Sequence, residues 1–489
     1  MRNSRRQALS AAARVWSCPS AADVALRRWL RRHERAFAQA ALAVGAALWL
    51  GAQAQAADAR MSTGAADTCE LHYRITPRHD TTPRVLDIEL EFPAGTREET
   101  FLRLAPQWAG VSDYAQALVG WRGASVGVQV APADLANRWL VSHARGGTVR
   151  VAFQARAALP DPGDDQRTQA QSPLYRTQIG ADWFQFFGYG VLPSVEPWGD
   201  ETTTHQCVTI TQPGHPDAAA FGSHFNGRGE HLKFAFTGSP AQLRHAFHGG
   251  GAGWRLSDRS LANGPVHIAV CGRFALDDAV FADQAAALID TQRRFWDDPH
   301  ASAQAEAQWL VLTPNFMRGN VGGTLVHQAA VLHADADFSP SHPSFASLIG
   351  HENLHQWIPG RFGAQGGDEP LRERHDWFSE GFSDYYTHRL LLASGLWTLP
   401  RCAEELTQML RGYWRSPARN ATAVDIAPRF FSDRDAGRQM YSRGELLAMR
   451  WDRALREQGH AGLDAALQRL LLPQPVPPGG RRAALGSRL

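Results

Sequence analysis

Short runs in which apolar and polar residues alternate fill the chain from Cys69 to about Phe274. In VLDIELEFP, apolar side chains occupy every second position and acidic ones stand between them, which is the period of a strand with one buried face. Similar runs are GTVRVAFQAR, RWLVSHA, QCVTITQ, HLKFAFTG and VHIAVCGRF. Because turns rich in Gly, Pro and Asp separate them, we predict an all-β, sandwich-like N-terminal domain over residues 57–275.

The pattern changes near Leu276. The segment ALDDAVFADQAAALIDTQRRFWDD, which begins at Ala275, has the periodicity of a helix, and QWLVLTP (308–314) is typical of a strand. From there the chain is predicted to be helical with loops. Residues 276–472 are therefore expected to form a second, mostly α domain.

Three helices of this second domain have recognisable ends. Pro343 suits the first turn of a helix through SFASLIGHENLHQW, which Pro359 and the following Gly should stop. A second helix is expected over DWFSEGFSDYYTHRLLLAS, with Asp376 as its N-cap and Gly395 as its end. A third is expected from Arg438 to about Gln458.

The first 56 residues differ from the rest. They hold nine Arg but only two acidic residues, Asp23 and Glu34, and their last part belongs to an uncharged run that ends in a small-x-small pattern at Ala54-Gln55-Ala56. Residues 1–56 are therefore predicted to be a secretory signal peptide, which places the protein in the periplasm or outside the cell. The alternative is an uncleaved membrane anchor, because the uncharged run is long enough to span a bilayer.

The charge and composition of the chain limit the classes of partner that it can bind. Removal of residues 1–56 takes away nine positive and two negative charges, so the formal net charge goes from +2 to −5. A mildly acidic chain argues against a nucleic-acid partner, and no membrane contact is expected beyond the leader. The Pro/Gly-rich end, residues 473–489, is predicted to be a disordered tail; the sequence does not fix an oligomeric state.

Four cysteines remain after the leader: Cys69, Cys207, Cys271 and Cys402. No CxxC pair occurs among them, which argues against a cysteine zinc site. Export to an oxidising compartment permits disulfides. One disulfide in the N-terminal half and free buried thiols are both open alternatives.

The stretch HENLH carries the strongest chemical signal. On a helix, His351 and His355 stand one turn apart on one face, so both imidazoles can reach a single ion. Zinc accepts His nitrogens and keeps one position open for water in catalytic sites. Glu352 would lie beside that water and take its proton, which is the mechanical meaning of the H-E-x-x-H pattern.

A catalytic zinc site needs a third protein ligand. The metzincin extension is excluded, because Ile358 and Arg361 stand where it requires Gly and His. Glu380, in WFSEGFSDYY, supplies a carboxylate on a separate helix, and Asp384 lies one turn further on the same face. Glu380 is predicted to bind the metal, while Asp384 holds the other ring nitrogen of a ligand histidine.

A second electrophile should stabilise the negative charge that develops during peptide hydrolysis. Tyr441, Tyr385 and Tyr386 are candidates. The residues alone do not choose between them, since a tyrosine on a helix more often packs than catalyses.

These motifs together resemble the glycyl aminopeptidase family of gluzincin zinc metallopeptidases. The resemblance is carried by HENLHQW, WFSEGFSDYY and MYSRGELLAMRWDRALRE, and more weakly by LRLAPQWAGVSDYAQAL near the N-terminus. It implies a β-rich domain followed by a thermolysin-like catalytic domain. It also implies zinc on His351, His355 and Glu380, with Glu352 as general base and Tyr441 as oxyanion donor.

The resemblance further implies substrate-binding positions. Family members carry a Gly-Gly-Leu-Glu-His strand whose Glu can hold the substrate's free amine. This chain has Gly322, Gly323 and His327 but places Val326 where the Glu belongs. Arg361 occupies the place of a basic residue of the family, where it would bind a substrate carboxylate or form an ordinary exposed ion pair.

The leading prediction is an exported zinc peptidase, in the first place an aminopeptidase, acting on peptides or proteins. The loss of an acid at Val326 opens a second reading, an endopeptidase or narrow-specificity peptidase of the same fold. A third is an exported binding protein with an inactive catalytic module, because the chain ends soon after LDAALQRLLLP, where relatives often continue.

Overall fold

The computed structural model describes residues 69–158, 173–196, 202–296, 308–315, 321–339, 342, 344–358 and 369–471. The predicted signal peptide, Arg361, Pro343, Pro359 and the predicted tail lie outside the described residues. The chain divides into two compact units, which are described separately. The first comprises Ala57–Asp290 and Asp298–Leu348, and the described part of the second comprises residues 291–296, 349–358 and 369–471.

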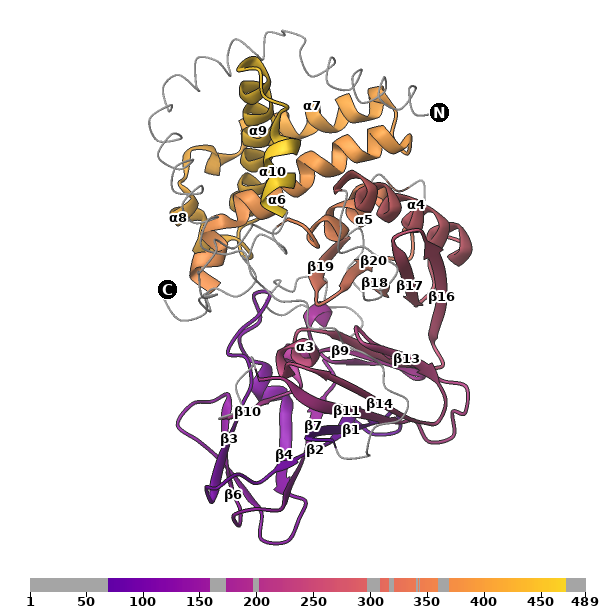
Figure 1. Ribbon diagram of the computed structural model, residues 1–489, viewed down its shortest axis with the longest axis vertical. Coiled ribbons are helices and arrows are strands. Elements are labelled where there is room, and N and C mark those ends of the chain that lie inside the picture. The colour runs from indigo at the N-terminus through magenta and orange to yellow at the C-terminus, as the bar shows by residue number, and fades with distance from the viewer. Residues whose placement is uncertain are drawn as a thin grey trace, which may run out of the picture. The chain divides into compact units, whose positions relative to one another are not determined.

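The first unit is built from four β-sheets, drawn mainly as indigo to magenta arrows (Figure 1). The largest is six-stranded, in the order β14-β11-β1-β2-β7-β4. Its strands are β1 (Leu71–Arg78), β2 (Val85–Pro93), β4 (Leu118–Gly123), β7 (Thr148–Arg156), β11 (Thr204–Thr211) and β14 (His231–Gly238). The predicted strand VLDIELEFP is β2, and its alternation is confirmed, since Leu86, Ile88, Leu90 and Phe92 are all buried.

A disulfide links the segment before β1 to β11 in this sheet. Cys69 lies two residues before the start of β1, and Cys207 lies in β11. The two strands pair in parallel with His72 opposite Cys207. The Cys69–Cys207 bond joins residues 138 positions apart. Cys271 and Cys402 are free and buried. The chain therefore has both a disulfide in its N-terminal half and free buried thiols, the two alternatives that the sequence left open.

Two smaller sheets complete the part that the alternating pattern predicts. The four-stranded sheet, β10-β3-β6-β5, consists of β3 (Glu99–Arg103), β5 (Gln129–Pro132), β6 (Arg138–Ser142) and β10 (Ser194–Glu196). The five-stranded sheet, β13-β12-β15-β9-β8, consists of β8 (Gln178–Ile179), β9 (Trp183–Phe187), β12 (Ala219–Gly222), β13 (Phe225–Arg228) and β15 (Phe247–Gly251). A short helix, α3 (Pro240–Arg244), begins with a capping box at Ser239 and Gln242.

The fourth sheet crosses the domain boundary expected near residue 275. Its order is β16-β17-β18-β20-β19, and its strands are β16 (Trp254–Leu261), β17 (Gly264–Cys271), β18 (Gln308–Pro314), β19 (Gly322–Val326) and β20 (Ala329–Ala334). β17 pairs in parallel with β18, so strands from both sides of residue 275 share one sheet. Parallel strands need a crossover connection, and the predicted helix α4 (Asp278–Trp296) lies in that connection.

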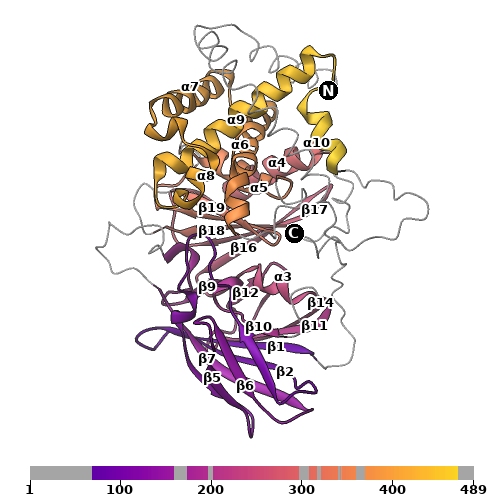
Figure 2. The same cartoon turned by 90° about the vertical axis from the view of Figure 1, so that its left-hand side faces the viewer.

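The remaining helices follow β20 along the chain (Figure 2). They are α5 (Phe345–Leu354), α6 (Glu369–Ser394), α7 (Leu399–Arg415), α8 (Ala423–Ile426), α9 (Arg434–Glu457) and α10 (Leu463–Leu471). The prediction of an all-β part followed by a mostly helical part is thus confirmed. Among the described residues, no helix combines the length and the apolar character that crossing a membrane requires.

The helix ends agree only in part with the sequence. Gly395 follows α6 with a positive φ of 78°, as expected for a C-terminal stop. The N-cap prediction for Asp376 is wrong, because α6 already begins at Glu369 and Asp376 is buried within it. Similarly, α9 begins before Arg438, where the Asp433 side chain accepts hydrogen bonds from the amides of Asp435 and Ala436.

Candidate metal centre

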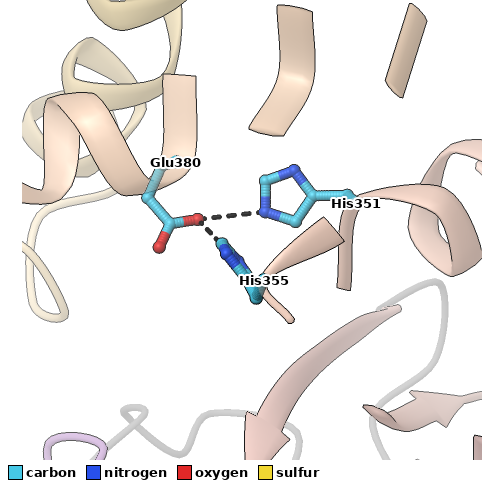
Figure 3. Close-up of side chains that lie close together, drawn as sticks. All are labelled: His351, His355 and Glu380. Atoms are coloured by element: carbon cyan, nitrogen blue, oxygen red, sulfur yellow. Dashed lines mark hydrogen bonds and ion pairs between the residues drawn. The ribbon is translucent and has the colours of Figure 1, made fainter. Parts of the chain in front are cut away.

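Three side chains from α5 and α6, or directly after them, converge in the helical unit (Figure 3). His351 Nε2 lies 3.0 Å from Glu380 Oε2, and His355 Nε2 lies 3.6 Å from the same oxygen. One ligand atom from each residue lies within 4.8 Å of the others. The two histidines are buried, and Glu380 is half-buried. The structure thus brings together the residues predicted to bind metal.

The turn after α5 fixes His355. The helix ends at Leu354, shorter than expected, and the amides of Trp357 and Ile358 both bond back to the Leu354 carbonyl. His355 therefore sits at the start of a tight turn, and its Nδ1 lies 2.8 Å from the Ile358 carbonyl oxygen. Because a carbonyl only accepts hydrogen bonds, Nδ1 carries the proton and Nε2 offers its lone pair to the site.

Asp384 orients the other histidine in the same way. Its Oδ1 lies 2.7 Å from His351 Nδ1, and a carboxylate here accepts the ring proton. The lone pair of His351 Nε2 then faces the Glu380 carboxylate. Burial lowers the pKa of His351, but Asp384 and Glu380 outweigh it and hold the pKa well above its ordinary value.

The donor set fits a zinc ion. In the neutral form each imidazole aims a lone pair at a carboxylate oxygen, and such acceptor–acceptor contacts are favourable only with a cation between them. Ligands about 2.05 Å from a tetrahedral zinc lie roughly 3.3 Å apart. The distances of 3.0 Å and 3.6 Å lie on either side of that value. Two His nitrogens and a carboxylate also match the composition of known catalytic zinc sites.

Glu352 follows His351 in α5 and is buried at 7% exposure. Burial raises the pKa of its carboxyl, as do the negative charges of Glu380 and Asp384, while the two histidines lower it. It makes no hydrogen bond or ion pair with another described residue. The carboxylate can therefore accept a proton from water or from a substrate.

Tyr441 reaches the site from α9, because two glycines let α9 approach α6 closely. A Cβ added at Gly381 would lie 2.3 Å from the Gly444 Cα, and one added at Gly444 would lie 1.7 Å from the Trp377 carbonyl oxygen. The Tyr441 ring stacks near His351, with centroids 5.8 Å apart. Burial and the charges of the neighbouring carboxylates raise the pKa of its phenol well above the usual range.

The part of the chain that carries this geometry matches a known family. Residues 344–446 match the sequence model of the M61 glycyl aminopeptidases. This segment of the chain is similar to the M61 glycyl aminopeptidases. The prediction of a zinc metallopeptidase of the glycyl aminopeptidase family is thereby confirmed.

A solved structure shares the fold. An aminopeptidase N family protein from Idiomarina loihiensis matches with a TM-score of 0.67 and 18% identity, over 82% of this chain and 70% of that chain. An M1 zinc metallopeptidase from Deinococcus radiodurans, in a mutant bound to a Tyr-Ser-Ala substrate, matches with a TM-score of 0.45 and 17% identity, over 82% and 84% of the two chains. A search of curated proteins gives no match.

Within the segment that matches the M61 model, the other two tyrosine candidates are engaged elsewhere. The Tyr386 hydroxyl donates to Asp464 over 3.2 Å, and the Tyr385 hydroxyl accepts from Arg389 over 3.3 Å. Arg389 in turn forms an ion pair with Asp464 of α10. These two tyrosines therefore anchor the last described helix, and Tyr441 remains the candidate that stacks on a ligand histidine.

The predicted substrate-binding positions that precede the matched segment lie in the other compact unit. Gly322 and Gly323 begin β19, and the Gly323 carbonyl accepts a hydrogen bond from Tyr175 over 3.3 Å. Val326 ends the strand and is buried at 6% exposure in the apolar core of that unit. His327 is half-buried, and its amide donates to the His245 carbonyl over 2.8 Å.

Two buried residues that help to position this site were not predicted from the sequence. Gln292 of α4 donates from its amide to the Gly350 carbonyl over 2.7 Å and accepts from Asn353, the residue between Glu352 and Leu354. Both side chains are fully buried. No local pattern marks Gln292, because it lies 59 residues before His351 in a helix with ordinary amphipathic spacing.

Proposed function

We propose that the protein is an exported zinc aminopeptidase. The observation that carries the catalytic part is the convergence of His351, His355 and Glu380 with both Nδ1 protons already committed, inside the segment that matches the M61 glycyl aminopeptidases. This arrangement leaves two imidazole lone pairs and one carboxylate facing a common point. Such a set of donors suits a divalent cation.

The roles of the surrounding residues follow from their positions. A zinc ion held there would polarise the scissile carbonyl and make water a better nucleophile at neutral pH. Glu352 would take a proton from the attacking water and return it to the leaving nitrogen as the C–N bond breaks. The Tyr441 hydroxyl would donate a hydrogen bond to the carbonyl oxygen as negative charge develops on it.

The test combines metal content with one matched pair of variants. We expect about one zinc per chain, and hydrolysis of short peptides, in the purified protein. Glu352→Gln should keep the zinc and lower kcat/KM by about 10²- to 10⁴-fold. Glu404→Gln, on an exposed part of α7, is the control and should behave as wild type. Absence of zinc, or equal activity in the two variants, would contradict the proposal.

Because Val326 is buried and carries no charge, endopeptidase activity is a second candidate function. An apolar side chain that packs in a core offers no carboxylate to a substrate's free amine. Peptides with a free N-terminus and their N-acetylated forms separate the two activities, because an aminopeptidase should reject the acetylated forms. Equal cleavage of both supports the endopeptidase. Stoichiometric zinc without turnover of either supports an inactive binding module.

Export rests on the predicted signal peptide and on the disulfide. A Cys69–Cys207 bond is typical of proteins that fold in an oxidising compartment. Fractionation of cells that express the full chain should find the protein outside the cytoplasm, with a new N-terminus close to Ala56. Protein recovered from the cytoplasm with both thiols reduced would argue against export.

A further inference from the structure

A line of ionisable side chains runs along α6 beyond the metal ligand. Glu380, Asp384 and His388 follow one another at four-residue spacing, which places them on one helix face. His388 does not contact the ligand histidines; its Nδ1 lies 2.8 Å from Oε1 of Glu445 on α9. The line therefore ends in a polar pair that joins α6 to α9.

Glu445 is buried to an unusual degree for a carboxylate. It is 0% exposed, and its Oε2 has no hydrogen-bond partner among the described residues. His388 is 9% exposed and stacks on Trp397, with centroids 5.3 Å apart. Burial lowers the pKa of His388, but Glu445 outweighs it and raises the pKa to about 9. The imidazolium of His388 thus supplies the positive charge that pairs with the buried Glu445 carboxylate.

Stability alone is a weak explanation for such a pair. Removing two charges from water is costly, and replacing a buried ion pair by apolar residues of similar size is often neutral or stabilising. Buried polar pairs are better attested as devices that fix the register of two packed helices. The same interface already contains the Gly381–Gly444 contact, which sets how closely α6 and α9 approach but gives no directional bond.

The pair stands one turn from the proposed oxyanion donor. Glu445 follows Tyr441 by four residues in α9, directly after Gly444. His388 follows Asp384 by four residues in α6. A slide of α9 along α6 would therefore break the bond between His388 and Glu445 and displace Tyr441 relative to Glu380.

We propose that His388 and Glu445 are positioning residues that fix the register of α9 on α6 and so hold the Tyr441 hydroxyl in place for catalysis. This inference rests on the proposed peptidase function. The pair forms no hydrogen bond or ion pair with His351, His355 or Glu380, so we expect its effect to fall on kcat and to pass through Tyr441. Metal binding and substrate KM should change little.

The test compares two substitutions of similar size at one position. Glu445→Gln keeps an acceptor oxygen for His388 and should retain kcat within about 3-fold. Glu445→Met removes the acceptor and should lower kcat by about 10- to 100-fold, the scale expected for a small misplacement of a catalytic group. Arg389→Met is the control, because it removes another buried ion pair of α6, to Asp464, that does not involve the interface beside Tyr441.

A double-mutant cycle separates positioning from general loosening. In a Tyr441→Phe background, Glu445→Met should have almost no further effect on kcat, since the group it positions is already gone. Additive effects, or equal losses in Glu445→Met and Arg389→Met, would overturn the proposal. Equal kcat in Glu445→Gln and Glu445→Met would overturn it too. If Glu445→Met does not fold, the double variant His388→Leu/Glu445→Leu takes its place, with the same outcomes.

Backbone hydrogen exchange gives a readout that needs no turnover. In the zinc-loaded protein, the amides of residues 440–443 should exchange faster in Glu445→Met than in wild type. In Arg389→Met, the exchange rates of the same amides should equal those of wild type. Equal exchange in wild type and Glu445→Met counts against the positioning role. A wild-type protein without peptidase activity contradicts the proposed function instead, and the exchange comparison still decides the role of the pair.

Discussion

His351 Nδ1 lies 2.7 Å from Asp384 Oδ1, and this bond joins α5, which carries His351 and is followed directly by His355, to α6, which carries Glu380. The bond fixes both the tautomer and the ring orientation of His351. Asp384 stands one turn after Glu380, so a single face of α6 supplies a ligand and the support for another ligand. The geometry of the site is therefore set before any ion arrives.

Removing the charge of Asp384 should weaken zinc binding. In Asp384→Asn, the amide can present a donor to His351 Nδ1 and so favour the wrong tautomer. We expect the dissociation constant for zinc to rise about 10- to 100-fold, as for other groups that support a metal ligand. Competition with a chelator of known affinity measures it. Asp80→Asn, with a 75% exposed side chain, is the control; equal affinity in both variants would refute the supporting role.

The glycine contact between α6 and α9 should tolerate no side chain. In Gly444→Ala, the added Cβ would lie 1.7 Å from the Trp377 carbonyl oxygen, so the helices must separate. We expect a loss of several kcal/mol of stability, or no folded protein, by the overpacking mechanism. Gly412→Ala in α7 meets no atom within 4 Å and should stabilise by about 0.5–1 kcal/mol. Thermal unfolding of both variants measures the contrast; similar midpoints would contradict it.

The sequence predicted those parts of the site that local spacing encodes. Four-residue spacing predicted that His351 and His355 would reach one ion, and they do converge although α5 ends at Leu354. The same spacing linked Glu380 to Asp384 on one face of α6. These relations need no knowledge of the fold. The strand VLDIELEFP is a similar case, because a period of two survives in any sheet that buries one face.

Contacts between segments that lie far apart in the chain could not be predicted from the sequence. Gln292 supports α5 through a tertiary contact that no period or motif marks. The bond between His388 and Glu445 depends on how α9 crosses α6, which the glycines decide. Asp376 looked like an N-cap because Asp often is one, yet α6 extends beyond it.

Val326 should not accept the glutamate that the family resemblance leads one to expect. Its side chain is 6% exposed and packs in the apolar core of the first unit. In Val326→Glu, we expect a loss of about 2–4 kcal/mol from burying a carboxyl without a partner. Val424→Glu, at a position 57% exposed, should cost little. Urea unfolding compares the two; a stable Val326→Glu protein with raised aminopeptidase activity would show that this position can face substrate.

The pair His388–Glu445 should make stability fall with rising pH. The pKa of His388 is raised from 6.5 to about 9, mainly because Glu445 outweighs burial, with help from Asp384 and Glu405. A group whose pKa is higher in the folded state stabilises fully below its unfolded pKa, and this contribution disappears as pH rises through the folded value. The stabilisation is therefore complete near pH 6.5 and lost by about pH 10.

The measurement is the difference in unfolding free energy between wild type and His388→Leu/Glu445→Leu, in metal-free buffer from pH 6.5 to 10. The other titrating groups, His351 included, occur in both proteins and largely cancel in the difference. The wild type should lose up to about 3 kcal/mol relative to the variant across this range, because each pKa unit corresponds to about 1.4 kcal/mol. A difference that stays constant, or that grows with pH, would show that His388 does not carry the counter-charge for Glu445.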